Sequence, residues 1–319
     1  MLTDLGLSIV YEYMSRVVIV RFQSPFDTKS LGSKDYRLML TLGLKELAET
    51  TQLKDAVRKF VPVGPVGLKT NCLTRKFSST PVSLVDALSE ILNQAGTDEN
   101  DILVWDRTNH EVEAAGFKLN ASSFGRKAIG TDAGGFGYSR EIYSSGDVNS
   151  LVSRILTDAV TANINLPVLK DHSIAGLSAG LKNLYGAINN PNKYHDNHCD
   201  PFAAHILNLT PIRERQKLSI VDAVRVQYNG GPGFDSRYLA MYGGIIISDD
   251  PVAADSVALE ILEHFRKENN LVSLEKSGRP VKYLATAEKL GLGTADSGKI
   301  DLIVKQIDQS GQSQNGSLF

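Results

Sequence analysis

Histidine is well suited to proton transfer near neutral pH, and this chain concentrates its histidines in one stretch. Four of the six lie between residues 172 and 205, namely His172, His195, His198 and His205. A mostly apolar run, Ile164 to Leu169, comes just before them and ends abruptly in Lys170, Asp171 and His172. Open α/β sheets place their ligands at the carboxyl ends of strands. The clustering therefore indicates a functional site in this part of the chain.

Two residues of this strand end are the leading candidates for catalysis. Lys170 could bind an anion, and His172 could carry a proton or act as a ligand. The alternative is that both are ordinary polar residues that cap the strand and the next helix. Their position at a strand end favours the site, so we predict catalytic roles for Lys170 and His172.

A segment of small residues, Ala175 to Tyr185, follows and carries Lys182 and Asn183. We interpret this segment as a helix whose small side chains let its backbone approach a ligand closely. A lysine on such a helix can also simply extend to solvent. We predict that Lys182 and Asn183 line a ligand pocket.

The polar loop after this segment holds donors that suit a transition metal. His195, His198 and Cys199 offer two imidazoles and a thiolate, which zinc binds well. Loops also favour His, Asn and Asp for their turn-forming properties, and no second ligand pair completes a set. The loop is therefore a candidate metal site that ranks below an anion site.

Polar residues at other strand ends are expected to complete one cleft. Asp222 and Asp255 are candidate catalytic carboxylates, and Lys69 and Asn71 end another apolar run. Gly231 belongs to a glycine-rich loop whose N–H groups could hold an anion, although this loop matches neither nucleotide-binding fingerprint. The six side chains expected to converge are Lys69, Lys170, His172, Lys182, Asp222 and Asp255.

Composition limits the classes of function. The 319 residues are 42% hydrophobic and 22% charged, and the net charge of −2 gives no electrostatic basis for binding nucleic acid or an anionic membrane. No run is long enough for a transmembrane helix. Cys72 and Cys199 are too few for a four-cysteine iron–sulfur cluster and fit a reduced, cytoplasmic protein. A small anionic molecule is the expected partner.

Apolar runs that alternate with helical stripes must position these residues. This alternation is typical of an α/β fold with a mostly parallel sheet and helices on both faces, in one lobe or in two lobes around a cleft. The predicted core strands are Val17–Phe22, Val66–Thr70, Ile102–Trp105, Ile164–Leu169, Leu218–Val221 and Gly244–Ile247. The predicted helices span 34–49, 81–95, 147–159, 175–185, 252–267 and 280–290, with Asp250 as the cap of the fifth.

The two ends of the chain differ in composition from the rest. Residues 1–13 are interpreted as an N-terminal extension, or as preceding a true start at Met14. Residues 309–319 are rich in Ser, Gln and Gly and are predicted to be a disordered tail. Residues 14–308 are expected to form a single domain.

Four motifs in order resemble the family known as domain of unknown function 362. In LPVLKDHSIAGLSAGLKNLYGAI a strand-end Lys-x-His precedes a Lys-Asn-x-x-Gly helix, as in that family. The resemblance continues through SIVDAVRVQYNGGPG, GGIIISDDPVAADSVALEIL and GLGTADSGKIDLI, and covers almost all of the chain from about Met14 onward. It implies that His195 or His198 matches a family position. It implies no particular activity, and the iron–sulfur module of some members is absent here.

Two functions from different classes follow from these observations. The first is an enzyme that acts on a small anionic molecule, with the three lysines holding the anion, His172 transferring a proton and an aspartate orienting it. The second is a metal- or cofactor-binding accessory protein whose ligands are His195, His198 and Cys199, with His172 as a fourth donor. A purely structural module is disfavoured, because many polar groups end buried strands.

Overall fold

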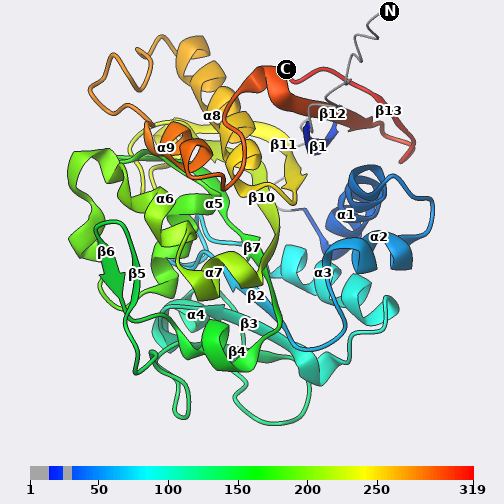
Figure 1. The fold of residues 1–319 in the computed structure, drawn as a ribbon. Helices are drawn as coiled ribbons and strands as arrows, with labels where there is room; N and C mark the ends of the chain where they lie inside the picture. Colours follow the sequence, from blue (N-terminus) through cyan, green and yellow to red (C-terminus); the bar gives the residue numbers. More distant parts are fainter. Residues whose placement is uncertain (1–13, 24–30) are drawn as a thin grey trace, which may run out of the picture.

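The computed structural model describes residues 14–23 and 31–319, and eleven strands in these ranges form one sheet (Figure 1). Its main path runs β13–β12–β1–β11–β10–β7–β2–β3–β4, while β8 pairs with β10 and β9 pairs with β8. The strands are β1 Ser15–Phe22, β2 Val66–Thr70, β3 Ile102–Asp106, β4 Lys127–Gly130, β7 Ala162–Leu166, β8 Val168–His172, β9 Gly176–Ser178, β10 Gln216–Gln227, β11 Leu239–Ser248, β12 Ile300–Ile307 and β13 Ser313–Asn315. A separate hairpin pairs β5 (Tyr143–Ser145) with β6 (Val148–Ser150).

Most neighbouring strands in this sheet run parallel. The parallel pairs join β1 to β12, β10 to β7 and β8, β2 to β7 and β3, and β3 to β4. The antiparallel pairs involve β11 on both of its sides, β12 with β13, and β8 with β9. The predicted α/β class with a mostly parallel sheet is confirmed.

Helices cover both faces of the sheet, and alternating side chains of the strands explain why. In β3, Ile102 and Val104 pack into the same apolar cluster as α1 to α4, whereas Leu103 and Trp105 pack into a cluster with α5, α6, α7 and α9. The helices are α1 Ser33–Ala48, α2 Leu53–Phe60, α3 Val82–Gln94, α4 Asn109–Ala114, α5 Gly180–Asn183, α6 Phe202–Leu207, α7 Thr210–Arg215, α8 Pro251–Glu268 and α9 Tyr283–Lys289. None of the helices in the described ranges is both long and apolar enough to span a bilayer.

Asp250 caps α8 as predicted, because its carboxylate accepts the N–H groups of Val252 and Ala253. The predicted strand Ile164–Leu169 is instead two strands, β7 and β8, separated by Pro167. Proline has no N–H for the ladder, and its carbonyl accepts the N–H of Asp222 at 2.8 Å. The apolar run continues across this break, so hydrophobicity alone does not reveal it.

The predicted helix 175–185 is largely wrong. Its first part forms β9, which pairs antiparallel with β8, and only Gly180–Asn183 is α-helical before a 3-10 turn at Leu184–Ala187. Gly176 has a φ of +76°, which favours glycine, and this turn brings the chain back onto β8. The small residues that suggested a helix allow this close backbone pairing instead.

Two further segments differ from their predictions. The predicted helix 147–159 contains β6 and a single π-helical turn at Ile155–Ala159. The tail expected to be disordered carries β13, whose backbone pairs with β12. Backbone pairing to an open strand edge needs no apolar side chains, so composition does not reveal it. Residues 1–13, interpreted as an extension, lie outside the described residues.

Candidate functional site

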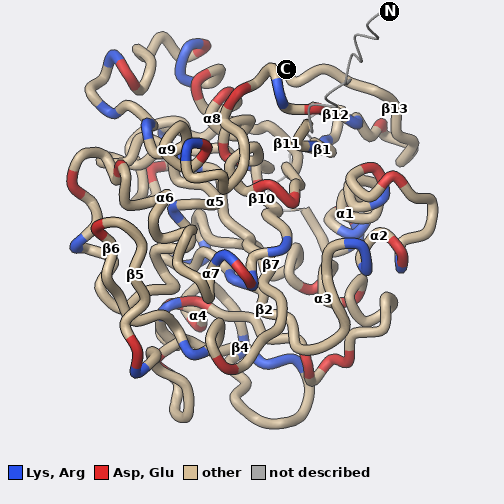
Figure 2. Tube along the Cα trace, viewed as in Figure 1, with Lys and Arg blue, Asp and Glu red and all other residues tan. Residues whose placement is uncertain are grey.

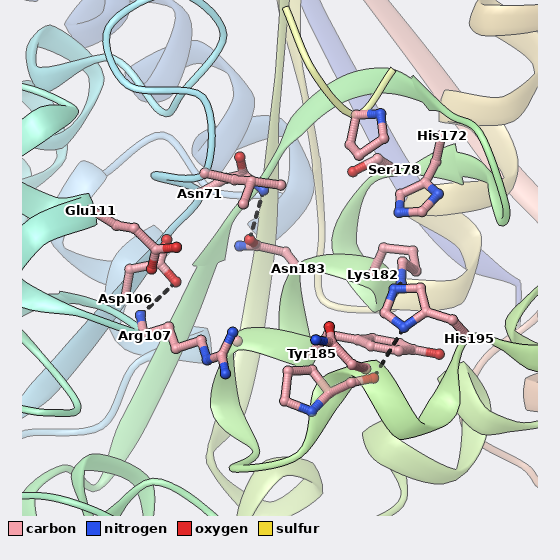
Figure 3. Close-up of a pocket in the computed structure, with 15 residues that line it drawn as sticks. Asn71, Asp106, Arg107, Glu111, His172, Ser178, Lys182, Asn183, Tyr185 and His195 are labelled. Carbon is pink, nitrogen blue, oxygen red and sulfur yellow. Dashed lines mark hydrogen bonds between the residues drawn. The ribbon is translucent and has the colours of Figure 1, made fainter. Parts of the chain in front are cut away.

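A cavity of about 170 Å³ opens where β2, β3 and β8 end, and we refer to it as the cleft (Figure 3). Because β2 and β3 are parallel neighbours, Asn71 and Arg107 leave their strands at the same edge of the sheet. The residues that line the cleft are Asn71, Leu73, Asp106, Arg107, Glu111, His172, Ser178, Lys182, Asn183, Tyr185, Gly186, Pro191, Asn192, His195 and Pro232.

Lys182 is the lysine of the cleft wall, and its ammonium group is surrounded by an imidazole, a thiol and an aromatic ring. Its Nζ lies 3.1 Å from Nε2 of His195, 3.6 Å from Sγ of Cys199 and 3.4 Å from the centre of the Tyr185 ring. No carboxylate of the described residues pairs with it. Burial therefore dominates and lowers the pKa of Lys182 to about 8.

His172 is held as a neutral imidazole with a defined tautomer. Its Nδ1 accepts the backbone N–H groups of Ile174 at 3.1 Å and Ala175 at 3.2 Å, so this nitrogen carries no proton. The proton of the neutral ring therefore sits on Nε2. Burial, followed by the nearby charge of Lys182, lowers the pKa of His172 to about 3. At neutral pH His172 is a hydrogen-bond donor and not a base.

His195 stands beside His172, with the two ring centres 5.8 Å apart (Figure 3). Its Nδ1 lies 3.0 Å from the Pro191 carbonyl, which must accept a hydrogen there, so the Nε2 lone pair faces Lys182. Burial and the charge of Lys182 both lower the pKa of His195. The pair of His195 and Lys182 can share one proton.

A buried polar network forms the floor next to the cleft. Lys69 makes a 2.6 Å ion pair with Asp106, and both side chains are nearly inaccessible. Asn183 contacts Asn71 at 3.2 Å and Asn165 at 2.8 Å. The predicted ligand-binding residues Asn71 and Asn183 therefore reach the cleft, whereas the charge of Lys69 is already neutralised.

Lys170 lies behind the cleft wall. It is fully buried, and its Nζ donates to Oδ1 of Asn71 and to the Ser78 carbonyl, each at 3.1 Å. Burial lowers the pKa of Lys170 to about 8. This lysine holds the segment 71–80 in place, and a ligand in the cleft meets Asn71 first.

The structure does not bring the two predicted catalytic aspartates to the cleft. Asp222 lines a separate cavity of about 300 Å³, where it accepts a hydrogen bond from Tyr36, and burial raises its pKa to about 6. Asp255 is fully buried under α5 and accepts the N–H groups of Gly180 and Leu181. Burial raises the pKa of Asp255 to about 7. Asp255 thus fixes the turn that carries Lys182.

The glycine-rich loop has a structural role at the position predicted to bind an anion. The N–H of Gly231 donates to Asp171 at 3.1 Å, so it is not directed at a ligand. A Cβ at Gly231 would lie 1.8 Å from the Asp171 carbonyl oxygen, which explains the glycine. Asp171 also pairs with Arg279 at 2.7 Å and Arg266 at 3.6 Å.

The three proposed metal ligands do not form a set. His195 faces Lys182, Nδ1 of His198 lies 3.1 Å from the Ile174 carbonyl, and Cys199 is buried beneath Lys182. In the part of the chain that the structure describes, no group of three or more His, Cys, Asp or Glu side chains could hold a metal ion.

Sequence reasoning missed Arg107 and Tyr185. Figure 3 shows the Arg107 side chain extending into the cleft between the carboxylates of Asp106 and Glu111 and the ring of Tyr185. The signal for Arg107 was available, because it follows β3 in the same way that Asn71 follows β2. Across the chain, basic and acidic residues are interspersed (Figure 2), and the cleft itself holds both signs, with Arg107 and Lys182 beside Asp106 and Glu111.

Comparisons with known proteins support the family and leave the activity open. The family model described as "Domain of unknown function (DUF362)" matches residues 66–260. A crystal structure of a Thermotoga maritima protein from a structural genomics programme is similar, with a TM-score of 0.40, 13% identity and coverage of 69% of this chain. The match spans 59% of that protein, and no curated protein matches this sequence. Since the family model covers more than half of the chain, the protein belongs to the DUF362 family.

Proposed function

We propose that the cleft binds a small organic anion and that the protein is an enzyme acting on it. The observation that supports this most directly is Lys182, a buried ammonium group without a carboxylate partner among the described residues. Arg107 adds a second cation to the same cavity. An anion would pair with both cations, and a guanidinium and an ammonium are common ligands of carboxylate and phosphate groups.

The side chains around Lys182 supply acid–base chemistry. His172 offers its Nε2–H to a substrate oxygen that gains negative charge during the reaction. A neutral imidazole has this role in other active sites. His195 and Lys182 exchange a proton across 3.1 Å. Lys182, with a pKa of about 8, is present in both protonation states near neutral pH. We therefore assign proton transfer to Lys182 and His195, and hydrogen-bond donation to His172.

Binding of inorganic phosphate or acetate, followed by NMR or calorimetry, tests the proposal. Lys182→Met keeps most of the side-chain volume and removes the charge, so anion affinity should fall about tenfold to a hundredfold, as for one charged hydrogen bond. Lys193→Met is the matched control, because Lys193 is exposed on the neighbouring loop. Equal affinity in the wild type and in Lys182→Met would overturn the anion site.

A metal-dependent role makes a different prediction. If the His195–Asp200 loop served a metal, purified untagged protein would hold the metal in stoichiometric amounts, and His198→Ala would release it. Elemental analysis of the wild type distinguishes the two functions, since the anion site requires no metal at His198. A stoichiometric metal held by His195 and His198 would reverse our preference.

A further inference from the structure

Lys182 has the environment of a nucleophilic amine. It is the lysine among the cleft residues, it is 7% exposed, and an unprotonated imidazole nitrogen lies 3.1 Å from it. Lysines become nucleophiles when an apolar or cationic setting favours the neutral amine. Here Tyr185 covers one side of the amine, and burial makes the neutral form accessible near pH 8.

The other two site lysines lack this environment. Lys69 already has a carboxylate partner, because it forms a 2.6 Å ion pair with Asp106. Lys170 is fully buried and does not reach the cleft. Only Lys182 combines access to the cavity, a neighbouring proton acceptor and no carboxylate partner among the described residues.

We propose that Lys182 forms an imine with the carbonyl group of a small 2-oxo carboxylate. This inference rests on the proposed function and names the substrate class of the same site. Arg107 lines the same cavity and is the guanidinium that would bind the carboxylate. The volume of about 170 Å³ suits a small molecule.

The reaction balances without an oxidant or a reductant. The Lys182 ammonium first gives a proton to Nε2 of His195. The amine then attacks the carbonyl carbon, a C–N bond forms, and a proton moves from nitrogen to the former carbonyl oxygen. The proton held by His195 returns to the hydroxyl group of this carbinolamine, which leaves as water, and the nitrogen lone pair forms the C=N bond of a protonated imine. The Nε2–H of His172 is the donor available to the oxygen as it gains negative charge.

Reductive trapping tests the proposal directly. The whole protein is incubated with pyruvate and cyanoborohydride, and adducts are located by peptide mass spectrometry. We expect one dominant adduct, at Lys182, that is absent in Lys182→Arg and unchanged in Lys193→Arg. Lys182→Arg retains a positive charge, and its melting temperature reports whether it folds. Adducts spread over exposed lysines with Lys182 unmodified would overturn the proposal, and so would the absence of any adduct.

A neutral ketone tests the carboxylate contact. Trapping rates are measured for pyruvate and for acetone, and their ratio cancels the effect of the variant on the amine itself. In Arg107→Gln this ratio should fall about tenfold, since one charge-assisted contact is lost. An unchanged ratio would show that Arg107 does not recognise the carboxylate, and the substrate class would then be wrong.

The imine and the anion site can fail separately. Phosphate binding that depends on Lys182 without any pyruvate adduct would leave the anion site standing and remove the imine. An adduct at Lys182 without any binding of phosphate or acetate would remove the general anion site and retain the imine.

Discussion

At the scale of single residues, the site depends on which charged groups have partners. Lys69 has Asp106, whereas among the described residues Lys182 has only an imidazole, a thiol and an aromatic ring. A buried cation without a carboxylate loses solvation that nothing nearby fully replaces. The difference in partners distinguishes Lys182 from Lys69, and access to the cleft distinguishes it from the fully buried Lys170.

Anion binding should therefore weaken as pH rises through about 8. The folded-state pKa of Lys182 is lowered to about 8, so the ammonium that attracts an anion is lost above this pH. Phosphate affinity measured by calorimetry should fall about tenfold between pH 7 and pH 9, in line with loss of one charge. Lys182→Arg should abolish this dependence. A flat profile in the wild type would contradict the assignment.

His172 should not titrate near neutral pH. Its pKa is lowered to about 3, because the ring is buried and faces Lys182. Nitrogen NMR of the imidazole should show the Nε2–H tautomer from pH 5 to pH 8, because Nδ1 accepts two backbone N–H groups. Protonation of His172 within this range would show that His172 acts as a base after all.

At the scale of elements, Lys182 depends on a helix of only four residues. Gly180–Asn183 is too short to be stable alone, and the Asp255 carboxylate holds its first two N–H groups at 2.6 and 2.9 Å. A Cβ at Gly180 would approach this carboxylate to 2.8 Å, so the glycine is needed for the contact. Helix α8 thus positions the lysine of the cleft.

Asp255→Asn should lower the free energy of unfolding by about 1–3 kcal/mol at pH 7. The backbone N–H of either Gly180 or Leu181 would then face the NH₂ group of the asparagine and lose its acceptor. Ser256→Ala is the control, since that hydroxyl only contacts its own helix. The raised pKa of Asp255, about 7, means that the folded state binds more protons than the unfolded state between pH 4 and pH 7. The contribution of Asp255 therefore declines as pH rises through this window, and Asp255→Asn should lack that decline in denaturation curves.

The sequence predicts the strands better than the site. Continuous apolar runs identified β2 and β3 within one residue, because strands buried on both faces are apolar throughout. The segment 175–185 was mistaken for a helix because its small residues suit either structure, and pairing with β8 decided between them. Asp222 and Asp255 end up away from the cleft for a similar reason. Sequence places a carboxylate near a strand end, but it does not show which side of the sheet the carboxylate faces.

At the scale of the whole molecule, the C-terminal segment lies at the opposite end of the sheet from the cleft. β12 and β13 end the strand order on one side, and β3 and β4 end it on the other. The Leu318 carbonyl accepts a hydrogen bond from Tyr242, and the Phe319 ring stacks on His264 at 3.9 Å. The tail therefore contributes to packing and not to the site.

Removal of residues 309–319 should lower the free energy of unfolding by about 1–3 kcal/mol, since it exposes β12 and the Tyr242 face. Pyruvate trapping at Lys182 should proceed at the wild-type rate. Phe319→Ala should give a smaller loss, because β13 remains paired. The check is chemical denaturation of the three proteins. A truncated chain as stable as the wild type would indicate that the tail does not pack.

The strand β8 gives the chain a strict requirement for length. Its successive side chains point to opposite sides, so Lys170 and His172 face the segment 71–80 and the cleft while Asp171 reaches Arg279 and Gly231. One inserted or deleted residue after Pro167 would therefore turn each of these three side chains to the opposite side of the strand. Relatives of this protein are therefore expected to vary in residue type here and in the lengths of surface loops, but to keep the spacing from Pro167 to His172 unchanged.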